Sequence, residues 1–216
     1  ACVAPGTMAE HTRLDREADE DLLDRIAEGE TAALEVLFRR RQQNVYRFAL
    51  HLTGSPSMAD DVTQDVFVTV IRAAARFERG RAAVPAWLCG IARNFVRRRL
   101  AVDRGSTSID ADEGLEAALP APSPDPLHDL TSAEAVESLR RAVLSLPLRY
   151  REVLVLCDLQ ESSYLDAAAA LECPVGTVRS RLNRARALLT AKMQADGRVH
   201  QRRSFVTAQG VKRCLA

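Results

Sequence analysis

Apolar residues recur along most of the chain at intervals of three and four, which is the spacing of one face of an α-helix. In the first half, Val62, Val66 and Val70 are spaced by four, and the length of their segment and its lack of strict alternation favour a helix over a strand. The pattern predicts four helices that form one compact bundle, at residues 19–28, 31–53, 57–77 and 86–100.

Polar and helix-breaking residues predict where these helices begin and end. Thr31 and Ser57 each precede an apolar-periodic run, so we expect both to act as N-caps. Gly54 and Pro56 end the second helix, because glycine and proline interrupt helical geometry. The loop that precedes the fourth helix, residues 78–85, contains Gly80 and Pro85.

The second half predicts further helices around a tight turn. The periodicity resumes at residues 133–144, with Val136, Leu139 and Val143 expected to face inward, and continues through 149–159. A short alanine-rich helix at 164–171 is then joined by a turn to a helix at 177–193. This arrangement is typical of a helix-turn-helix, which places its second helix in the major groove of DNA.

The intervening segment, residues 101–132, has a different composition. Its four prolines alternate with other residues between positions 120 and 126, and its net charge is −6. Such a segment cannot form a helix there or build a core, so we expect a flexible acidic linker. The expected organisation is a disordered extension (1–18), a helical bundle (19–100), the linker (101–132), a helix-turn-helix domain (133–194) and a basic tail (195–216), for which disorder is favoured over phosphate or regulator binding.

The composition narrows the class of protein. The chain has 216 residues, of which 47% are hydrophobic and 5% aromatic, and its net charge is +1. It has no run of the about 18 apolar residues that a membrane span requires, and no apolar segment of signal-peptide length near its start. Its five cysteines are dispersed, which predicts reduced thiols, no metal site and a cytoplasmic location. The four histidines are far apart and no phosphate-binding glycine loop occurs, so we expect neither an enzyme nor a cofactor.

Basic side chains concentrate on the last predicted helix. Between residues 173 and 193 there are five basic residues and no acid, whereas a solvated surface helix usually interleaves both signs. Arginine can bond guanine bidentately, and asparagine or serine can contact adenine or phosphate. The pattern therefore predicts DNA binding by this helix rather than an ordinary solvated face. The expected contacts are Thr177, Arg179, Ser180, Arg181, Asn183 and Arg184.

Two separated blocks of sequence resemble RNA polymerase sigma factors of the extracytoplasmic-function (ECF) group. The first is Asp60-Asp61-Val62-Thr63-Gln64-Asp65-Val66-Phe67 with the later run from Ala86 to Asn94, which is similar to sigma region 2. The second is Leu146-Pro147, Arg151–Leu154 and the run from Pro174 to Arg186, which is similar to sigma region 4. The resemblance implies an all-α protein that binds the β and β′ subunits of core RNA polymerase, opens the −10 promoter element with region 2 and reads the −35 element as duplex DNA with region 4.

The resemblance also implies roles for individual residues of the first block. Asp61, Gln64, Asp65 and Val68 share one helix face and would dock on the polymerase. The −10 contacts would come from Arg79, Gly80, Arg81, Arg93, Asn94 and Arg97, whereas we expect Trp87 to belong to the core rather than to stack on a base. The linker would imitate a polyanion, although a plain tether fits the residues equally well. An anti-sigma factor is a further partner that the family implies.

A helix-turn-helix repressor or activator that is not a polymerase subunit is the alternative. It accounts for residues 177–193 but gives no purpose to the acidic face around Asp61 and Asp65.

Overall fold

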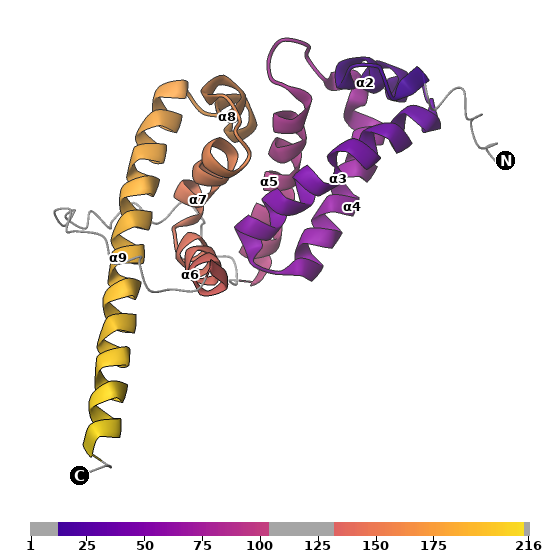
Figure 1. Ribbon diagram of the computed structural model, residues 1–216. Coiled ribbons are helices and arrows are strands. Elements are labelled where there is room, and N and C mark those ends of the chain that lie inside the picture. The colour runs from indigo at the N-terminus through magenta and orange to yellow at the C-terminus, as the bar shows by residue number, and fades with distance from the viewer. Residues whose placement is uncertain (1–12, 104–131, 214–216) are drawn as a thin grey trace.

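The computed structural model describes residues 13–103 and 132–213, and its regular elements in these ranges are all helical, as predicted (Figure 1). The elements in the first range are α2 (Asp19–Ala27), α3 (Thr31–Thr53), α4 (Pro56–Ala73), the 3₁₀ turn η1 (Ala74–Arg76) and α5 (Val84–Asp103). Those in the second range are α6 (Ser132–Leu144), α7 (Leu148–Leu154), the π-helical turn η3 (Val155–Leu159), α8 (Tyr164–Leu171) and α9 (Val175–Arg213).

Helices α2 to α5 pack their predicted apolar faces against one another. Leu22 and Leu23 of α2, Val45 of α3 and Val62 of α4 are all completely buried. The prediction of a disordered extension up to residue 18 is wrong for residues 13–18, because Leu14 is buried in this core and its carbonyl accepts a hydrogen bond from Arg40 at 3.1 Å. Residues 1–12 lie outside the described residues.

The helix starts differ from the prediction by one turn or less. Ser55, not Ser57, caps α4, and its hydroxyl accepts a hydrogen bond from the Met58 amide at 3.3 Å. The reason is that Pro56 occupies the first helical position, where its missing N–H and fixed φ are favourable. Thr31 is the first residue of α3 rather than its cap, and the capping position is held by Glu30 without a side-chain bond.

The C-terminal helices α6 to α9 form a second body. Val178, Leu182 and Ala185 of α9 are buried, as the periodicity predicted. On α6, however, Val136 and Leu139 are 44% and 39% exposed, because the buried side of this helix carries Ser138, Ala142 and Val143 instead.

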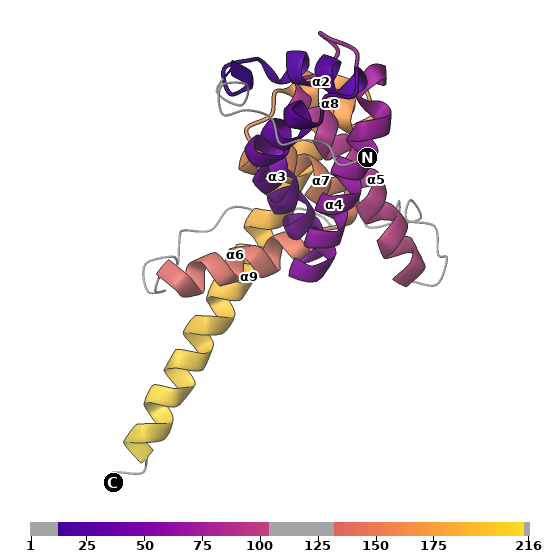
Figure 2. The ribbon, with the colours of Figure 1, turned by 90° about the vertical axis from the view of Figure 1, so that its right-hand side faces the viewer.

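The last helix is longer than predicted. Helix α9 continues as far as Arg213, so the absence of helix expected beyond Met193 is wrong. Once a helix is nucleated, each further residue adds one hydrogen bond, and each of the two glycines in this extension, Gly197 and Gly210, costs only about 1 kcal/mol. Figure 2 shows the last part of α9 extending away from the rest of the molecule.

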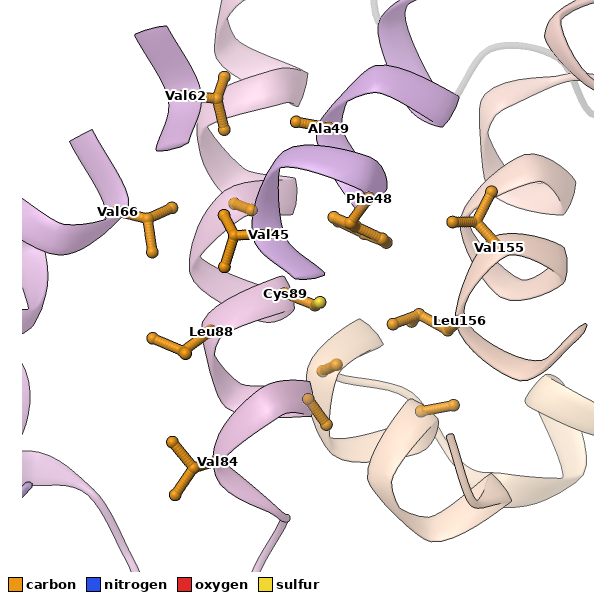
Figure 3. Close-up of a cluster of buried hydrophobic side chains, with 14 of the residues drawn as sticks. Val45, Phe48, Ala49, Val62, Val66, Val84, Leu88, Cys89, Val155 and Leu156 are labelled. Atoms are coloured by element: carbon orange, nitrogen blue, oxygen red, sulfur yellow. The ribbon is translucent and has the colours of Figure 1, made fainter. Parts of the chain in front are cut away.

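The two bodies pack against each other through a continuous apolar core. Phe48 of α3 and Cys89 of α5 point toward Val155 and Leu156 of η3, and these four side chains are essentially inaccessible to solvent (Figure 3). Gln160 joins the same contact, because it accepts a hydrogen bond from the Cys89 thiol at 3.1 Å and donates one to the Asn44 carbonyl at 2.9 Å. Of the predicted linker, residues 101–103 belong to α5 and residue 132 to α6, while 104–131 lie outside the described residues.

Candidate protein and nucleic-acid interfaces

One face of α4 presents side chains that the bundle does not use. Asp61, Gln64 and Val68 are exposed at successive turns, and Val68 is 53% exposed. Asp65 lies beside them, half-buried, and accepts a hydrogen bond from Arg99 of α5 at 2.7 Å. Ile71 extends the same face and is also 53% exposed. Sequence reasoning missed Ile71, although it follows Val68 by three residues.

Helices α8 and α9 form the predicted helix-turn-helix. Ser163 caps α8, since its hydroxyl accepts the Asp166 amide at 3.1 Å. The turn passes through Glu172, whose φ of 53° lies in the left-handed region that non-glycine residues adopt at a cost. Ala167 of α8 is completely buried.

The solvent-facing side of α9 carries the predicted DNA contacts. Arg179, Ser180 and Asn183 are exposed, whereas Thr177, Arg181 and Arg184 are half-buried. The guanidinium of Arg179 lies 5.8 Å from the centre of the Tyr164 ring, which orients it without neutralising its charge. Arg186, one turn after Asn183, is held by Asp158 through two hydrogen bonds of 2.6 and 2.9 Å, and this pairing raises its pKa.

The loop between η1 and α5 borders a small cavity. Its volume is 180 Å³, and its lining includes Phe77, Arg81, Trp87 and Asn94. The rings of Phe77 and Trp87 meet edge to face, with their centres 5.4 Å apart. Trp87 is only partly buried, so it belongs both to the core and to the cavity wall. The structure therefore brings Arg81 and Asn94 together at one site.

Arg79 points to a different place. It donates to Asp21 of α2 at 2.8 Å and also pairs with Asp24 of that helix. The hydrogen bonds that Arg79 donates to these two carboxylates raise the pKa of Arg79, and the one to Asp21 lowers the pKa of that carboxyl group. Gly80 follows in the left-handed conformation, with a φ of 83°.

Arg93 and Arg97 also leave the cavity and face the C-terminal body. Arg93 is 8% exposed, and its Nε lies 3.1 Å from a carboxylate oxygen of Glu152 in α7. Arg97 Nη1 lies 3.8 Å from the other oxygen of Glu152. Sequence reasoning missed Glu152, although an acid next to the apolar run of residues 153–156 was a sign that it had a buried partner.

No helix in the described ranges is both long and apolar enough to cross a membrane. No group of three or more potential metal ligands gathers among these residues either.

These features define an all-α protein that combines a helix-turn-helix with a second helical body bearing a separate exposed face. A model of sigma-70 region 2 matches residues 37–104, and a model of sigma-70 region 4 matches residues 136–189. Together the two matches cover more than half of the chain. The first lies in the N-terminal body and the second in the C-terminal body. The chain belongs to the sigma-70 family of RNA polymerase sigma factors, in its ECF group.

Relatives with the same organisation are similar over most of their length. The RNA polymerase sigma-H factor of Pseudomonas aeruginosa is 31% identical over 188 residues, which are 84% of this chain and 96% of that protein. The ECF RNA polymerase sigma factor SigC of Mycobacterium tuberculosis is 35% identical over 195 residues, with 86% and 96% covered. The ECF RNA polymerase sigma-E factor of Escherichia coli K12 is 35% identical over 183 residues, with 82% and 94% covered.

Solved structures share the fold. CnrH, in complex with the cytosolic domain of CnrY, is similar with a TM-score of 0.59 and 26% identity, over 83% of this chain and 99% of that one. The sigma factor RpoE of Bartonella quintana, in complex with the anti-sigma factor NepR, gives a TM-score of 0.55 and 27% identity, over 74% and 95%.

Proposed function

We propose that the chain acts as a dissociable subunit of RNA polymerase that directs transcription initiation to specific promoters. The observation that carries this proposal is the presence, on one chain, of both sigma regions with a different exposed surface on each. A repressor or activator would use α9 but would leave the exposed face of α4 without a partner.

The α4 face suits docking on the polymerase. Exposed carboxylate and amide oxygens accept hydrogen bonds from basic side chains, and Val68 and Ile71 add apolar area beside them. We assign core-enzyme binding to Asp61, Gln64, Asp65 and Val68, and we add Ile71 because it continues their face.

The two DNA interfaces follow from the remaining surfaces. Helix α9 would enter the major groove of the −35 element with Arg179, Ser180 and Asn183 foremost, supported by Thr177, Arg181 and Arg184. The cavity beside the loop would receive an unstacked base of the −10 element, because aromatic and amide groups can replace the stacking and hydrogen bonds that the base loses. Arg81 and Asn94 line this cavity, Arg79 and Gly80 belong to the loop, and Arg93 and Arg97 lie on the adjoining helix.

The proposed role implies a regulator as well as a polymerase. RpoE, one of the solved relatives, was captured with an anti-sigma factor. We propose that a protein of that kind also controls this chain.

The test is transcription in vitro by purified core polymerase on a pool of genomic promoters. We expect the added chain to start transcription at a subset of promoters that share −10 and −35 sequences. A chain that binds promoters but never redirects the core enzyme would instead be an ordinary DNA-binding regulator.

The docking face has its own test. Asp61→Lys combined with Asp65→Lys should abolish co-purification with core polymerase, because two attractive charges become repulsive while the fold stays intact. Glu28→Lys is the charge control, since Glu28 is exposed just beyond the end of α2 and does not belong to α4. Retention of the doubly reversed variant on core polymerase would show that the face is misassigned.

A further inference from the structure

The tip of the loop between η1 and α5 is held by an ionic contact with α2. Residues 78–81 are all exposed, and a Cβ atom at Gly80 would meet open space, so packing does not fix this part of the chain. Arg79 instead donates a hydrogen bond to Asp21 at 2.8 Å and also pairs with Asp24. These two ion pairs join the tip of the loop to a helix that lies more than 50 residues earlier in the sequence.

The two ends of the loop are fixed in other ways. At the start, the ring of Phe77 packs edge to face on Trp87, with their centres 5.4 Å apart. At the end, the amide of Ala83 donates a hydrogen bond to Asp166 of α8 at 2.6 Å, and Val84 is buried. None of these contacts involves the tip itself, so the position of the tip depends on the contact with α2.

Helix α2 is a fixed support for this contact. Asp21 and Asp24 are three residues apart and are therefore neighbours on one face of the helix. The other side of α2 carries Leu22, Leu23 and Ile26, which are buried in the core of the N-terminal body. The two carboxylates are thus held in place by a helix that cannot shift without exposing apolar surface.

The contact also determines which side chains of the loop reach the cavity. Arg79 faces α2, Gly80 turns the chain in the left-handed conformation with a φ of 83°, and Arg81 then lines the 180 Å³ cavity. Glu78 lines the cavity too, and its carboxylate lies 3.2 Å from Arg81. Release of Arg79 from α2 would free the backbone on both sides of Gly80, and the cavity wall at Glu78 and Arg81 would lose its fixed position.

From this geometry we propose that Asp21 and Asp24 are positioning residues for the selection of a −10 base, and that they act on the cavity wall through Arg79. The inference rests on the proposed function. It adds that α2 takes part in reading the −10 element, and that Arg79 holds the loop in place instead of contacting a phosphate. Exposed ion pairs contribute little to stability, so breaking this contact should release the tip and leave the fold intact.

The first variant combines Asp21→Asn with Asp24→Asn, which keeps the size of both side chains and removes both charges. The holoenzyme formed by this chain and core polymerase transcribes a promoter library whose −10 element is randomised, and sequencing of the transcripts gives the base preference at each position. We expect the preference at one −10 position to fall roughly fivefold or more, which is the discrimination that one base pair typically provides. The preferences in the −35 element and the melting temperature of the chain should stay at their wild-type values.

The matched control is Glu20→Gln combined with Glu28→Gln. It removes two negative charges from α2 and its C-cap but leaves the contact of Arg79 with Asp21 and Asp24 in place. Loss of negative charge alone would strengthen DNA binding in both double variants alike. A reduced base preference in the aspartate variant only is therefore the sign of positioning.

The second variant, Arg79→Gln, breaks the same contact from the side of the loop. We expect the same loss of base preference, and no further loss when it is combined with the two aspartate substitutions, because all three changes remove one interaction. The second readout is the salt dependence of holoenzyme binding to a labelled single strand that carries the preferred −10 sequence. Loss of an arginine–phosphate contact would lower the slope of log affinity against log salt concentration by about 0.7, whereas we expect the wild-type slope.

Two results would overturn the positioning role while the proposed function stands. One is a wild-type −10 preference in the aspartate variant. The other is a reduced salt slope for Arg79→Gln, with a loss of preference that adds to that of the aspartate variant, since Arg79 would then contact DNA directly. Failure of the proposed function gives a different result, because the wild-type chain itself would then start no transcription from the library.

Discussion

At the scale of single residues, the ion pairs of the N-terminal body differ in how much they contribute to stability. Asp19 pairs with Arg40 at 3.0 Å and with Arg41, and its side chain is only 6% exposed. Asp15 pairs with Arg39, but both of these side chains are about half exposed. Water screens an exposed ion pair, so its loss has little effect on stability. Removing one partner of a buried pair leaves an uncompensated buried charge, which is strongly destabilising.

We therefore expect Asp19→Ala to lower the free energy of unfolding by about 3 kcal/mol and Asp15→Ala by less than about 1 kcal/mol. Denaturant-induced unfolding measures both losses, provided that the variants and the wild type have the same slope of unfolding free energy against denaturant concentration. Equal losses in the two variants would mean that burial does not determine the strength of these pairs.

His51 gives the chain a dependence of stability on pH. It lies in a groove of 510 Å³ between α3 and α6, where burial lowers its pKa below 6.5 and Arg140 and Arg47 lower it further. As the pH falls below about 6.5, the unfolded chain takes up a proton that the folded chain refuses, so the folded state loses stability. His51→Gln should reduce the loss of stability between pH 7.5 and pH 5.5, measured by denaturant midpoints. An unchanged loss would assign that pH dependence to other groups.

At the scale of elements, the role of α9 in DNA binding can be tested by the dependence of the affinity on salt concentration. Arg179→Ala combined with Arg184→Ala should weaken binding to the −35 duplex, because two positive contacts to the DNA are lost. Each lost arginine–phosphate contact should also reduce the slope of log affinity against log salt concentration by about one. Arg72→Ala, an exposed arginine of α4, is the control for loss of charge alone. If the double variant keeps the wild-type slope and affinity, α9 does not read this element.

Local sequence patterns were sufficient to predict most helices, but not which faces of these helices other parts of the chain cover. The four-residue spacing of Val62, Val66 and Val70 predicted α4, because the residues that α4 buries are set by the local helical period. The same reasoning failed for Val136 and Leu139, since whether an apolar face is covered depends on distant packing. It also put the cap of α4 at Ser57, where Pro56 moves it to Ser55.

The candidate sites divide in the same way. The exposed faces of α4 and α9 were predictable, because exposure there follows from the helical period alone. The partners of Arg79 and Arg93 were not, since Asp21 is 58 residues from Arg79 and Glu152 lies in the other body. No spacing rule connects residues that meet only through tertiary structure.

At the scale of the whole molecule, the core that joins the two bodies should make them unfold together. Phe48, Cys89, Val155 and Leu156 come from both bodies and are buried in one cluster, and burial raises the pKa of the Cys89 thiol because its charged form is disfavoured there. Neither body can then lose its structure without exposing apolar surface of the other. The free chain is expected to show a single calorimetric transition.

Leu156→Ala tests this coupling because it removes a buried side chain from the shared core. We expect a loss of about 2–5 kcal/mol, seen as a lower midpoint of the one transition. Leu165→Ala is the matched control, since Leu165 is 70% exposed and its loss should leave the midpoint almost unchanged. Two resolved transitions, with only the one assigned to the C-terminal body displaced, would mean that the bodies fold independently.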